Sequence, residues 1–437
     1  SVDNADQLKL VDGRARTFGS KITFSEPINS VWAVVVDYGF NTNNSYSYRN
    51  TFDKDLSGKY AIRDEEFSNN FNLEASSRSG SATLRFMGRK MKGSLGSGIS
   101  DIKLKLHHLD SNKTNIYHFL NFTPQAAMGY NLRPQTRLFL NYRGTTRQPT
   151  IDQLQPIRDN ADRLNIFIGN PDLKVGFNHN FNLGFNSYKT LSQTFIQANV
   201  GYIIPVNAIT FYNSLDVTRG KQTYTPVNVN GNRSWNTWFN MSRESANNKF
   251  SYGFNVSASG GKNFNYIDEI ENGVIAKKIN RTDYMNSDLG LDFRFGDEEN
   301  NNIQIGPTVG YNISKSSLRP GQNNNYWNYG GNIDVLLILP GMLEFITVCE
   351  FDLRQRISGF ATNPSQIRWK ASLSKKIFKN NSGKFYLIAN DILDQNRGFN
   401  RSITSNFILE ERYSRISRYF LLKFEWSFNK MQEGEKQ

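Results

Sequence analysis

The residues that could carry out chemistry in this sequence are few, and their spacing does not suit it. His107 and His108 are adjacent, so on a β-strand their side chains point to opposite faces and cannot bind one metal ion together. His118 and His179 stand apart from them. The sequence contains no H-E-x-x-H, G-x-S-x-G or C-x-x-C motif. We therefore expect no catalytic residues, no metal site, no cofactor and no enzymatic activity.

Two further features resemble binding motifs only formally. The stretch GSLGSG, Gly93–Gly98, has the glycine content of a phosphate-binding loop, but its polar surroundings predict an ordinary loop between strands. The acidic residues of Asp297–Glu299 and of Asp268–Glu271 could attract a divalent cation, although solvated turns explain them more simply.

Polar residues that alternate with apolar ones suggest a different kind of site. A wall with water on one side presents hydrogen-bonding residues of mixed charge to that side, where they can hold a plug or contact a polar solute. The positions that fit this description, and that we expect to face a lumen, are Asn178, Asn180, Asn182, Asp292, Arg294, Arg368 and Lys370. For any one of them taken alone, we favour the simpler interpretation that it only solvates the wall.

These residues belong to stretches with a period of two. In FNHNFNLGFN, residues 177–186, one face carries Phe177, Phe181, Leu183 and Phe185, and the other carries asparagines. The same alternation recurs in KFSYGFNVSAS, LGLDFRF, QIRWKASL and RYFLLKFEWSFN. A period of two predicts half-exposed β-strands, and its recurrence without a linker predicts one continuous sheet.

The composition indicates where such a sheet would be stable. Of 437 residues, 38% are hydrophobic and 13% aromatic, so rings are abundant although aliphatic residues are not. The most apolar run, VLLILPGMLEFI, is interrupted by Pro340, Gly341 and Glu344, which excludes a membrane helix. The net charge of +13 is scattered rather than clustered, so we expect no nucleic-acid partner. The single cysteine, Cys349, lies in an alternating stretch and is expected to have an apolar role.

Two architectures can use this pattern. A soluble β-sandwich or propeller would point the apolar face into a dry core. A transmembrane β-barrel would point it toward lipid, with backbone groups paired between strands and a polar interior. Aromatic residues near strand ends and a polar face of Asn, Ser and Gly favour the barrel.

The connections between the expected strands alternate in length. Short ones are expected at residues 25–30, 77–81, 133–135, 242–248, 296–302, 339–342 and 379–383, and long polar ones near residues 46–64, 93–114, 147–172, 212–226, 261–281 and 395–416. In outer-membrane barrels the short turns lie on the periplasmic side. We expect about seventeen strands, uncertain by two because the segments 93–114 and 402–411 could be loop ribbons. Since single-chain barrels usually have an even number, the odd count implies missing upstream strands, a second chain or a miscount by one.

Two motifs resemble a known family. The segment Arg143–Asn186 resembles TonB-dependent-receptor-like barrels, especially the outer membrane β-barrel family of Bacteroidetes. The matching positions are Arg147, Pro149, Leu154, Pro156, Asp162, Leu164, Asn165, Gly169, Asn170, Pro171, Leu173 and Lys174, whereas Val175 and Gly176 replace the Pro-Glu of the family. Near the end, ANDILDQNRGFNRS and SRYFLLKFEWSFNK are similar to the family's closing strands.

The resemblance implies more than the residue pattern does. It implies an outer-membrane location in a Gram-negative bacterium, a complete barrel of about twenty-two strands, and uptake of a peptide, glycan or metal chelate; a structural subunit of a larger complex is the alternative. It also implies outer-membrane lipid, lipopolysaccharide, TonB, other outer-membrane subunits and the barrel assembly machinery as partners, the last recognising Phe424, Trp426 and Phe428. We expect an N-terminal segment at 1–15 that resembles no plug, a barrel at 16–430 and a polar tail at 431–437.

Overall fold

The computed structural model describes residues 6–155, 158–159, 165–216, 221–247, 249–271, 274–297, 301–356, 365–378, 382–396, 398–403 and 408–427. Nearly all of them are in β-strands, and the helical elements among them are α1 (Ile151–Leu154) and the 3-10 turns Thr190–Ser192 and Pro320–Gln322. Among these residues, none of the helices has the length and apolar character needed to cross a membrane.

The chain divides into two units, which are described separately. Unit 1 comprises Ser1–Gly184, Val200–Trp235 and Gly261–Arg281, and unit 2 comprises Phe185–Asn199, Asn236–Gly260 and Thr282–Gln437. The strands of unit 1 are β1 (Gln7–Pro27), β2 (Trp32–Lys54), β3 (Tyr60–Met87), β4 (Met91–His108), β5 (Lys113–Arg133), β6 (Thr136–Arg147), β7 (Arg158–Asp159), β8 (Asn165–Ile168), β11 (Ala208–Asp216) and β12 (Lys221–Val229). Strands β9 (Gly176–Lys189), β10 (Thr194–Val206), β13 (Arg233–Glu244), β14 (Phe250–Glu271) and β15 (Val274–Gly296) contribute residues to both units.

Unit 2 contains the remaining strands. They are β16 (Asn302–Ser316), β17 (Asn324–Leu339), β18 (Leu343–Arg354), β19 (Gln366–Ile377), β20 (Gly383–Asn390), β21 (Gly398–Ile403), β22 (Ile408–Tyr413) and β23 (Tyr419–Trp426). Strands β15 to β20 pair with their neighbours in sequence, and β23 then pairs with β20. Strands β21 and β22 form a separate ribbon within the connection from β20 to β23.

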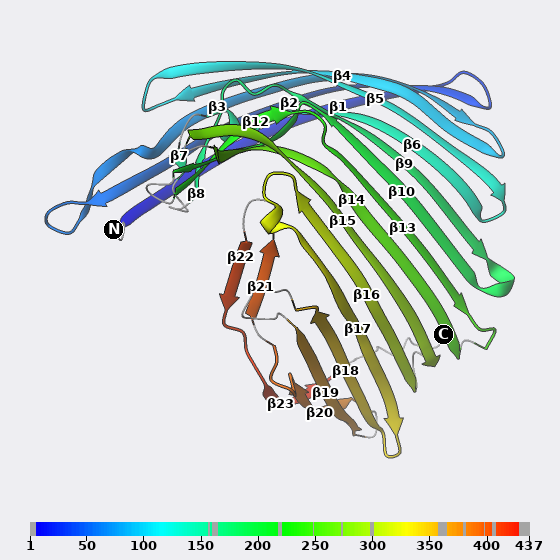
Figure 1. Cartoon of the computed structure of the whole chain (residues 1–437). Coiled ribbons are helices and arrows are strands. Elements are labelled where there is room, and N and C mark those ends of the chain that lie inside the picture. Colours follow the sequence, from blue (N-terminus) through cyan, green and yellow to red (C-terminus); the bar gives the residue numbers. More distant parts are fainter. Residues whose placement is uncertain are drawn as a thin grey trace, which may run out of the picture. The chain divides into compact units, whose positions relative to one another are not determined.

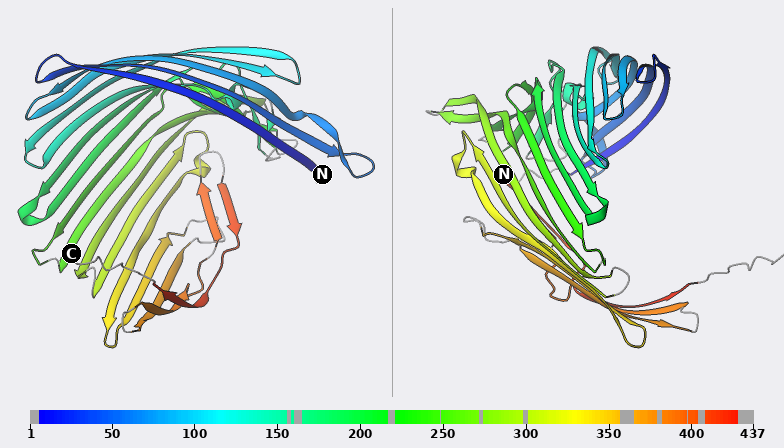
Figure 2. Two further views of the ribbon diagram at one scale, coloured as in Figure 1. Left: turned by 180° about the vertical axis from the view of Figure 1, so that it is seen from behind. Right: turned by 90° about the vertical axis from the view of Figure 1, so that its right-hand side faces the viewer.

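Antiparallel neighbours also form the sheet of unit 1. Each strand from β1 to β5 pairs with the next one in sequence, and Figures 1 and 2 show β1 to β6 side by side. The long antiparallel strands of the main sheet number seventeen among the described residues. They are β1–β6, β9, β10, β13–β20 and β23. The expectation of an antiparallel sheet of about seventeen strands is thus confirmed.

The two faces of the sheet differ in chemistry. Directly opposed residues of antiparallel strands share a face, so the register defines rows of side chains across the strands. In unit 1 one such row is Ile22–Tyr38–Gly80–Ile99–Phe122, and in unit 2 another is Ile305–Ile333–Cys349–Trp369. We call this side the apolar face and the opposite side the polar face. On the polar face of unit 1, Asp37 pairs with Lys21 at 3.1 Å and accepts hydrogen bonds from Thr23 and Ser81.

Several connections differ from those expected. The stretch Ser77–Ser81 lies inside β3, where it pairs with residues of β2 and of β4, so it is not a turn. The segment 93–114 is not a long loop either: Gly93–Gly98 and the residues after it form β4, which pairs along its whole length with β5. Both segments are rich in small polar residues, which suggest turns, but neighbouring strands satisfy their backbone groups on both sides.

Three other segments that the sequence predicts to be long loops are parts of long β-hairpins in the structure. Residues 46–64 belong largely to β2 and β3, residues 212–226 to β11 and β12, and residues 261–281 to β14 and β15. Strand β1 begins at Gln7, so that residues 7–15 pair with β2 along the same strand as residues 16–27. A strand outside a bilayer has water on both faces, so it loses the alternation that identifies a strand from sequence.

Candidate functional site

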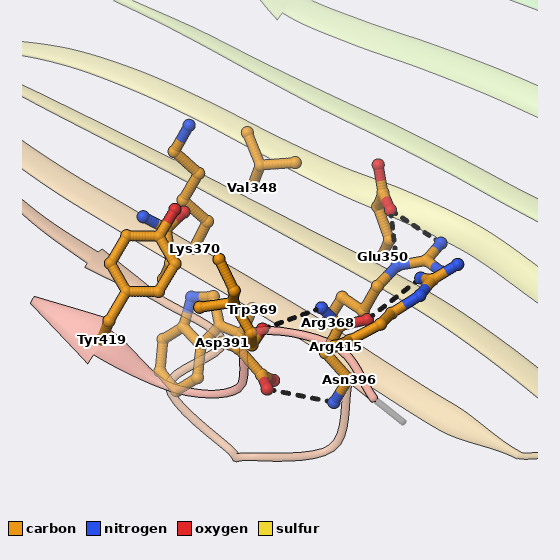
Figure 3. A pocket seen from close by; sticks show the side chains of 11 residues that line it. Val348, Glu350, Arg368, Trp369, Lys370, Asp391, Asn396, Arg415 and Tyr419 are labelled. Atoms are coloured by element: carbon orange, nitrogen blue, oxygen red, sulfur yellow. Dashed lines mark hydrogen bonds and ion pairs between the residues drawn. The ribbon is translucent and has the colours of Figure 1, made fainter. Parts of the chain in front are cut away.

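A pocket of about 450 Å³ lies in unit 2, at the end of the strands where the ribbon β21–β22 is inserted. It is formed by β18, β19, the end of β20, the start of β23 and the segments that flank the ribbon. Its lining residues are Val348, Glu350, Arg368, Trp369, Lys370, Asn390, Asp391, Asn396, Arg415, Ile416 and Tyr419 (Figure 3). A volume of this size is within the range of small-ligand sites.

The strand register places the charged residues of the pocket. Val348 is opposite Lys370 and Glu350 is opposite Arg368, so these four side chains share the polar face. The Arg368 guanidinium donates to Glu350 Oε2 from Nε at 3.0 Å and from Nη2 at 2.8 Å. Lys370 makes no side-chain hydrogen bond or ion pair with any described residue, and Figure 3 shows it beside Val348 and Tyr419.

The opposite part of the pocket is a tight turn after β20. The carboxylate of Asp391, which is buried, accepts hydrogen bonds from the backbone N–H groups of Gln395 and Asn396, both at 3.0 Å. The side-chain oxygen of Asn396 in turn accepts from Arg415 at 3.2 Å. Arg415 also donates to the Tyr413 hydroxyl at 2.7 Å. The turn and the segment before β23 are thereby joined.

The electrostatics of the pocket favour an anionic group. Three cations, Arg368, Lys370 and Arg415, face two carboxylates, those of Glu350 and Asp391. Both carboxylates are already hydrogen-bonded, Glu350 to Arg368 and Asp391 to backbone N–H groups. An ammonium without a partner and guanidinium N–H groups can bind a carboxylate or phosphate oxygen through charge-assisted hydrogen bonds.

Comparison with known proteins identifies the architecture around this pocket. The model of the outer membrane protein beta-barrel family matches residues 3–426. The chain belongs to this family. Its location is therefore the outer membrane, where the apolar face of a barrel contacts lipid and the polar face lines the lumen.

Several solved structures resemble the chain. They include the copper transporter OprC (9% identity, TM-score 0.44, covering 95% of this chain and 74% of that chain), the RagAB peptide importer in the closed-closed state (9%, 0.45, 96% and 63%) and the siderophore receptor PirA from Pseudomonas aeruginosa (11%, 0.43, 95% and 71%). The chain spans less than two thirds of the RagAB chain it matches. No curated protein matches the sequence.

Polar residues nearer the short-turn end of the same barrel strands are satisfied among themselves. Lys384 Nζ contacts both oxygens of Glu344, at 2.9 and 3.1 Å, and lies 5.0 Å from the centre of the Tyr386 ring. Lys423 lies over the other side of this cluster, 4.8 Å from the same ring centre, and pairs with Glu425 at 2.7 Å. This cluster is balanced in charge, and it solvates and stabilises the wall.

Only two of the expected lumen residues, Arg368 and Lys370, are brought together in the pocket. Asp292 and Arg294, also in unit 2, have partners elsewhere: Asp292 accepts from Gln304 at 2.9 Å, and Arg294 pairs with Glu244 at 2.6 Å. Their geometry fits wall solvation.

The asparagines of β9 are in unit 1. Asn180 donates to the Arg143 carbonyl at 3.0 Å and to the Thr145 hydroxyl at 3.4 Å, and Asn178 and Asn182 share its face by the period of two. Phe181 and Leu183 are exposed on the other face. This arrangement agrees with the alternation in the sequence.

The family-motif loop, with Arg147, Pro149, Gly169, Asn170 and Pro171, is an ordered packing element of unit 1. Its helix α1 is capped by Thr150, whose hydroxyl accepts from the Gln153 N–H at 3.3 Å. The Asn170 backbone N–H donates to the Gln153 carbonyl at 2.6 Å, and its side chain donates to the Pro226 carbonyl at 3.0 Å.

Leu154 and Leu173 anchor this loop in a small core with Phe119. The motif positions Pro156, Asp162 and Leu164 lie outside the described residues. Since the contacts that are described join the loop to other parts of unit 1, it has the character of a structural element.

Several pocket residues were not anticipated. Asp391 and Asn396 belong to the motif ANDILDQNR, which identified the family without suggesting a binding role. Arg415 lies in a polar stretch without periodicity, and Tyr419 lies at the start of the last alternating stretch. The acidic residues at 268–271 are not free in solvent: Asp268 accepts from the Tyr212 and Ser214 hydroxyls, and Lys278 pairs with Glu269 and Glu271.

The histidines and the closing aromatics can also be placed. His118 pairs with Asp101 at 2.5 Å, and the described part of the chain contains no group of three or more His, Cys, Asp or Glu arranged to hold a metal ion. Phe424 and Trp426 lie on the apolar face of β23, where the Phe424 ring packs at a tilt against Phe385 with ring centres 4.7 Å apart. Phe428 lies outside the described residues.

Proposed function

We propose that the chain forms the barrel of an outer-membrane uptake protein of the TonB-dependent-receptor-like type, and that the pocket binds an anionic group of the imported solute. The observation that carries this proposal is the Lys370 ammonium, which lies on the polar face without a partner among the described residues. Lys370 is exposed, so its ammonium is free to bind an anionic group through charge-assisted hydrogen bonds.

The pocket also bears on the nutrient class. Three cations whose carboxylate neighbours are already engaged fit an acidic peptide or a carboxylate-bearing metal chelate better than a neutral glycan. On this proposal TonB supplies the energy for uptake, and the barrel assembly machinery recognises the aromatic end of the last strand at Phe424 and Trp426.

Binding tests the pocket directly. An acidic tetrapeptide, ferric citrate and a neutral maltooligosaccharide are titrated into the detergent-solubilised protein by calorimetry. Lys370→Gln should weaken binding of the two anionic probes about tenfold, the order of magnitude of one charge-assisted hydrogen bond. Lys376→Gln, on the same strand and face but outside the pocket, should leave their affinity unchanged.

Two results would count against the proposal. If Lys370→Gln and Lys376→Gln bound the anionic probes with equal affinity, the pocket would not be the binding site. Binding of the neutral oligosaccharide alone would lead to the same conclusion. Accumulation of a bound probe by cells, and its loss with an uncoupler, tests uptake separately. Binding without energised accumulation, together with copurification in fixed ratio with other envelope proteins, would favour a structural subunit of a larger complex.

A further inference from the structure

The apolar face of unit 1 changes its chemistry abruptly along the strands. The row Ile22–Tyr38–Gly80–Ile99–Phe122 contains no charge, and neither does the next row toward the turn 28–31, which is Phe24–Val36–Ala82–Ser97–Pro124. In the opposite direction, toward the turn 55–59, charged residues begin in the adjacent row, which contains Arg78 and Asp101.

Four successive rows beyond this boundary carry the charges. They are Ser20–Phe40–Arg78–Asp101–Leu120, Phe18–Thr42–Ser76–Lys103–His118, Arg16–Asn44–Glu74–Lys105–Ile116 and Arg14–Tyr46–Asn72–His107–Thr114. We call the cations in these rows the basic belt: Arg14, Arg16, Arg78, Lys103 and Lys105.

The belt has more cations than the adjacent carboxylates can neutralise. Glu74 is paired with Lys105 at 3.4 Å, and Asp101 with His118 at 2.5 Å. The side chains of Arg14, Arg16, Arg78 and Lys103 are exposed and have no polar partner among the described residues. Four positive charges on the apolar face thus have no counterion among the described residues.

The position of the belt identifies the chemistry of its counterion. The rows next to the apolar band of an outer-membrane barrel lie at the depth of the lipid headgroups, where long basic side chains reach phosphate groups. Arg78 and Lys103 are diagonal neighbours on adjacent strands, with Cβ atoms roughly 7–8 Å apart. Two long side chains at this spacing can contact one phosphate from both sides.

The end of the strands that bears the belt indicates the leaflet. In a barrel of this class the long connections face the cell exterior, and the belt lies at the end of β5 and β6 that leads to the long connection 148–175. We propose that the basic belt binds the phosphate groups of an acylated, bisphosphorylated glycolipid of the outer leaflet, with its acyl chains against the adjacent apolar rows.

Unit 2 provides an internal contrast. At the same end of its strands the apolar face carries the rows Tyr311–Trp327 and Ile313–Asn325, and no cation in either. Headgroup-level aromatic residues are common to barrels of all kinds. The next row of β16 adds one exposed cation, Lys315, whereas the belt of unit 1 contains four exposed cations without a partner among the described residues.

The test compares two matched double variants by native mass spectrometry in detergent. Arg78→Gln with Lys103→Gln removes two belt charges from β3 and β4. Arg85→Gln with Lys92→Gln removes two charges from the polar face of the same two strands. The probes are bisphosphorylated lipid A, the same lipid without phosphates, and phosphatidylglycerol. Heat-modifiable migration on a gel confirms folding, and Lys103→Gln alone replaces the belt variant if that variant does not fold.

The wild-type protein and the polar-face variant should bind lipid A equally, and the belt variant about tenfold more weakly. Removing the lipid phosphates should abolish the difference between the variants. Equal binding of lipid A by both variants would overturn the proposal. It would also fail if phosphatidylglycerol bound as tightly as lipid A with the same dependence on the belt, because the occupant would then be any anionic lipid.

Discussion

The two units use the same alternating strands but differ in how far these strands extend. In unit 1, β1 to β5 are 18 to 28 residues long, whereas β16 to β20 in unit 2 are 8 to 16 residues long. A tilted strand crosses the hydrocarbon layer with about 9–11 residues. The strands of unit 2 therefore end near the membrane boundary, and those of unit 1 continue well beyond it.

The extensions of unit 1 are held together by side chains as well as by the sheet. Tyr212 and Ser214 donate to Asp268 at 2.5 and 2.7 Å, and Lys277 lies 4.4 Å from the centre of the Tyr212 ring and 4.6 Å from that of Tyr266. Phe119, Leu154 and Leu173 add a small apolar core. In unit 2 the polar contacts lie within the wall itself, and Lys370, which has no partner among the described residues, lines a pocket.

This difference separates two roles of polar residues in a barrel. Where strands leave the membrane, polar side chains stabilise a protein structure that lipid no longer supports. Where strands stop at the membrane, the same residue types either neutralise one another or remain available to a ligand. The four predictions that follow test which features the units share and which belong to one of them.

The largest effect should be common to both units. Leu183→Arg in unit 1 and Ile333→Arg in unit 2 each place a charge on the apolar face and should destabilise the folded barrel by about 2–4 kcal/mol, because the guanidinium is moved into hydrocarbon. Asn182→Arg, on the polar face one residue away, is the control. Urea unfolding in lipid vesicles measures all three, and equal tolerance of Leu183→Arg and Asn182→Arg would refute the assigned faces.

The second prediction concerns unit 1 alone. A Cβ atom at Gly169 would lie 1.9 Å from the Gln155 carbonyl oxygen, so Gly169→Ala must displace the family-motif loop from α1. We expect a cost of about 1–3 kcal/mol, typical of overpacking. Gly80→Ala, where a Cβ meets nothing within 4 Å, is the control. Hydrogen exchange should increase in α1 and at Leu173 only in the first variant, and unchanged exchange would show that the loop is not a packing element.

The sequence predicts the strands of unit 2 better than those of unit 1. Strands such as β18 and β19 have lipid on one face and water on the other, so nearly every residue carries the period of two. Ser77–Ser81 and residues 93–114 were misread as connections because Gly and Ser are turn formers in isolation. At these positions the backbone hydrogen bonds of two neighbouring strands decide the conformation, and no local pattern records those neighbours.

The pocket was only partly predictable for a related reason. The alternation identified Arg368 and Lys370 as residues of the polar face, because that requires only the strand they belong to. Asp391, Asn396 and Arg415 join them through a turn and a segment that follow no period, and their contacts depend on where the chain returns after the ribbon β21–β22. The spacing of residues along the sequence does not show that these distant segments meet.

A moderate effect should distinguish the ion pairs of the two units. Lys384→Met in unit 2 leaves Glu344, whose side chain is about one-fifth exposed, without its cation, and should cost about 1 kcal/mol. Lys105→Met in unit 1 breaks a pair with Glu74 that is about half exposed, and should change stability by less than about 0.5 kcal/mol. The same urea unfolding assay measures both variants. If both variants lost the same free energy of unfolding, the lower exposure of the Lys384–Glu344 pair would not make it more stabilising than the Lys105–Glu74 pair.

The smallest effect is a pH dependence confined to the β2–β3 turn of unit 1. Hydrogen bonds from the Ser57 hydroxyl and from the Lys59 and Ser57 N–H groups lower the pKa of Asp55 below its usual 3.8. Because the folded pKa is the lower one, the carboxylate stabilises the turn above pH 3.8, and this contribution is lost as the pH falls through the folded value. Exchange of the Ser57 and Lys59 amides, corrected for intrinsic rates, should therefore accelerate in wild type below that pH. Asp55→Asn keeps an oxygen acceptor but cannot titrate, so its protection should stay constant over the same range. If amide exchange accelerated equally at low pH in wild type and in Asp55→Asn, groups other than Asp55 would be responsible.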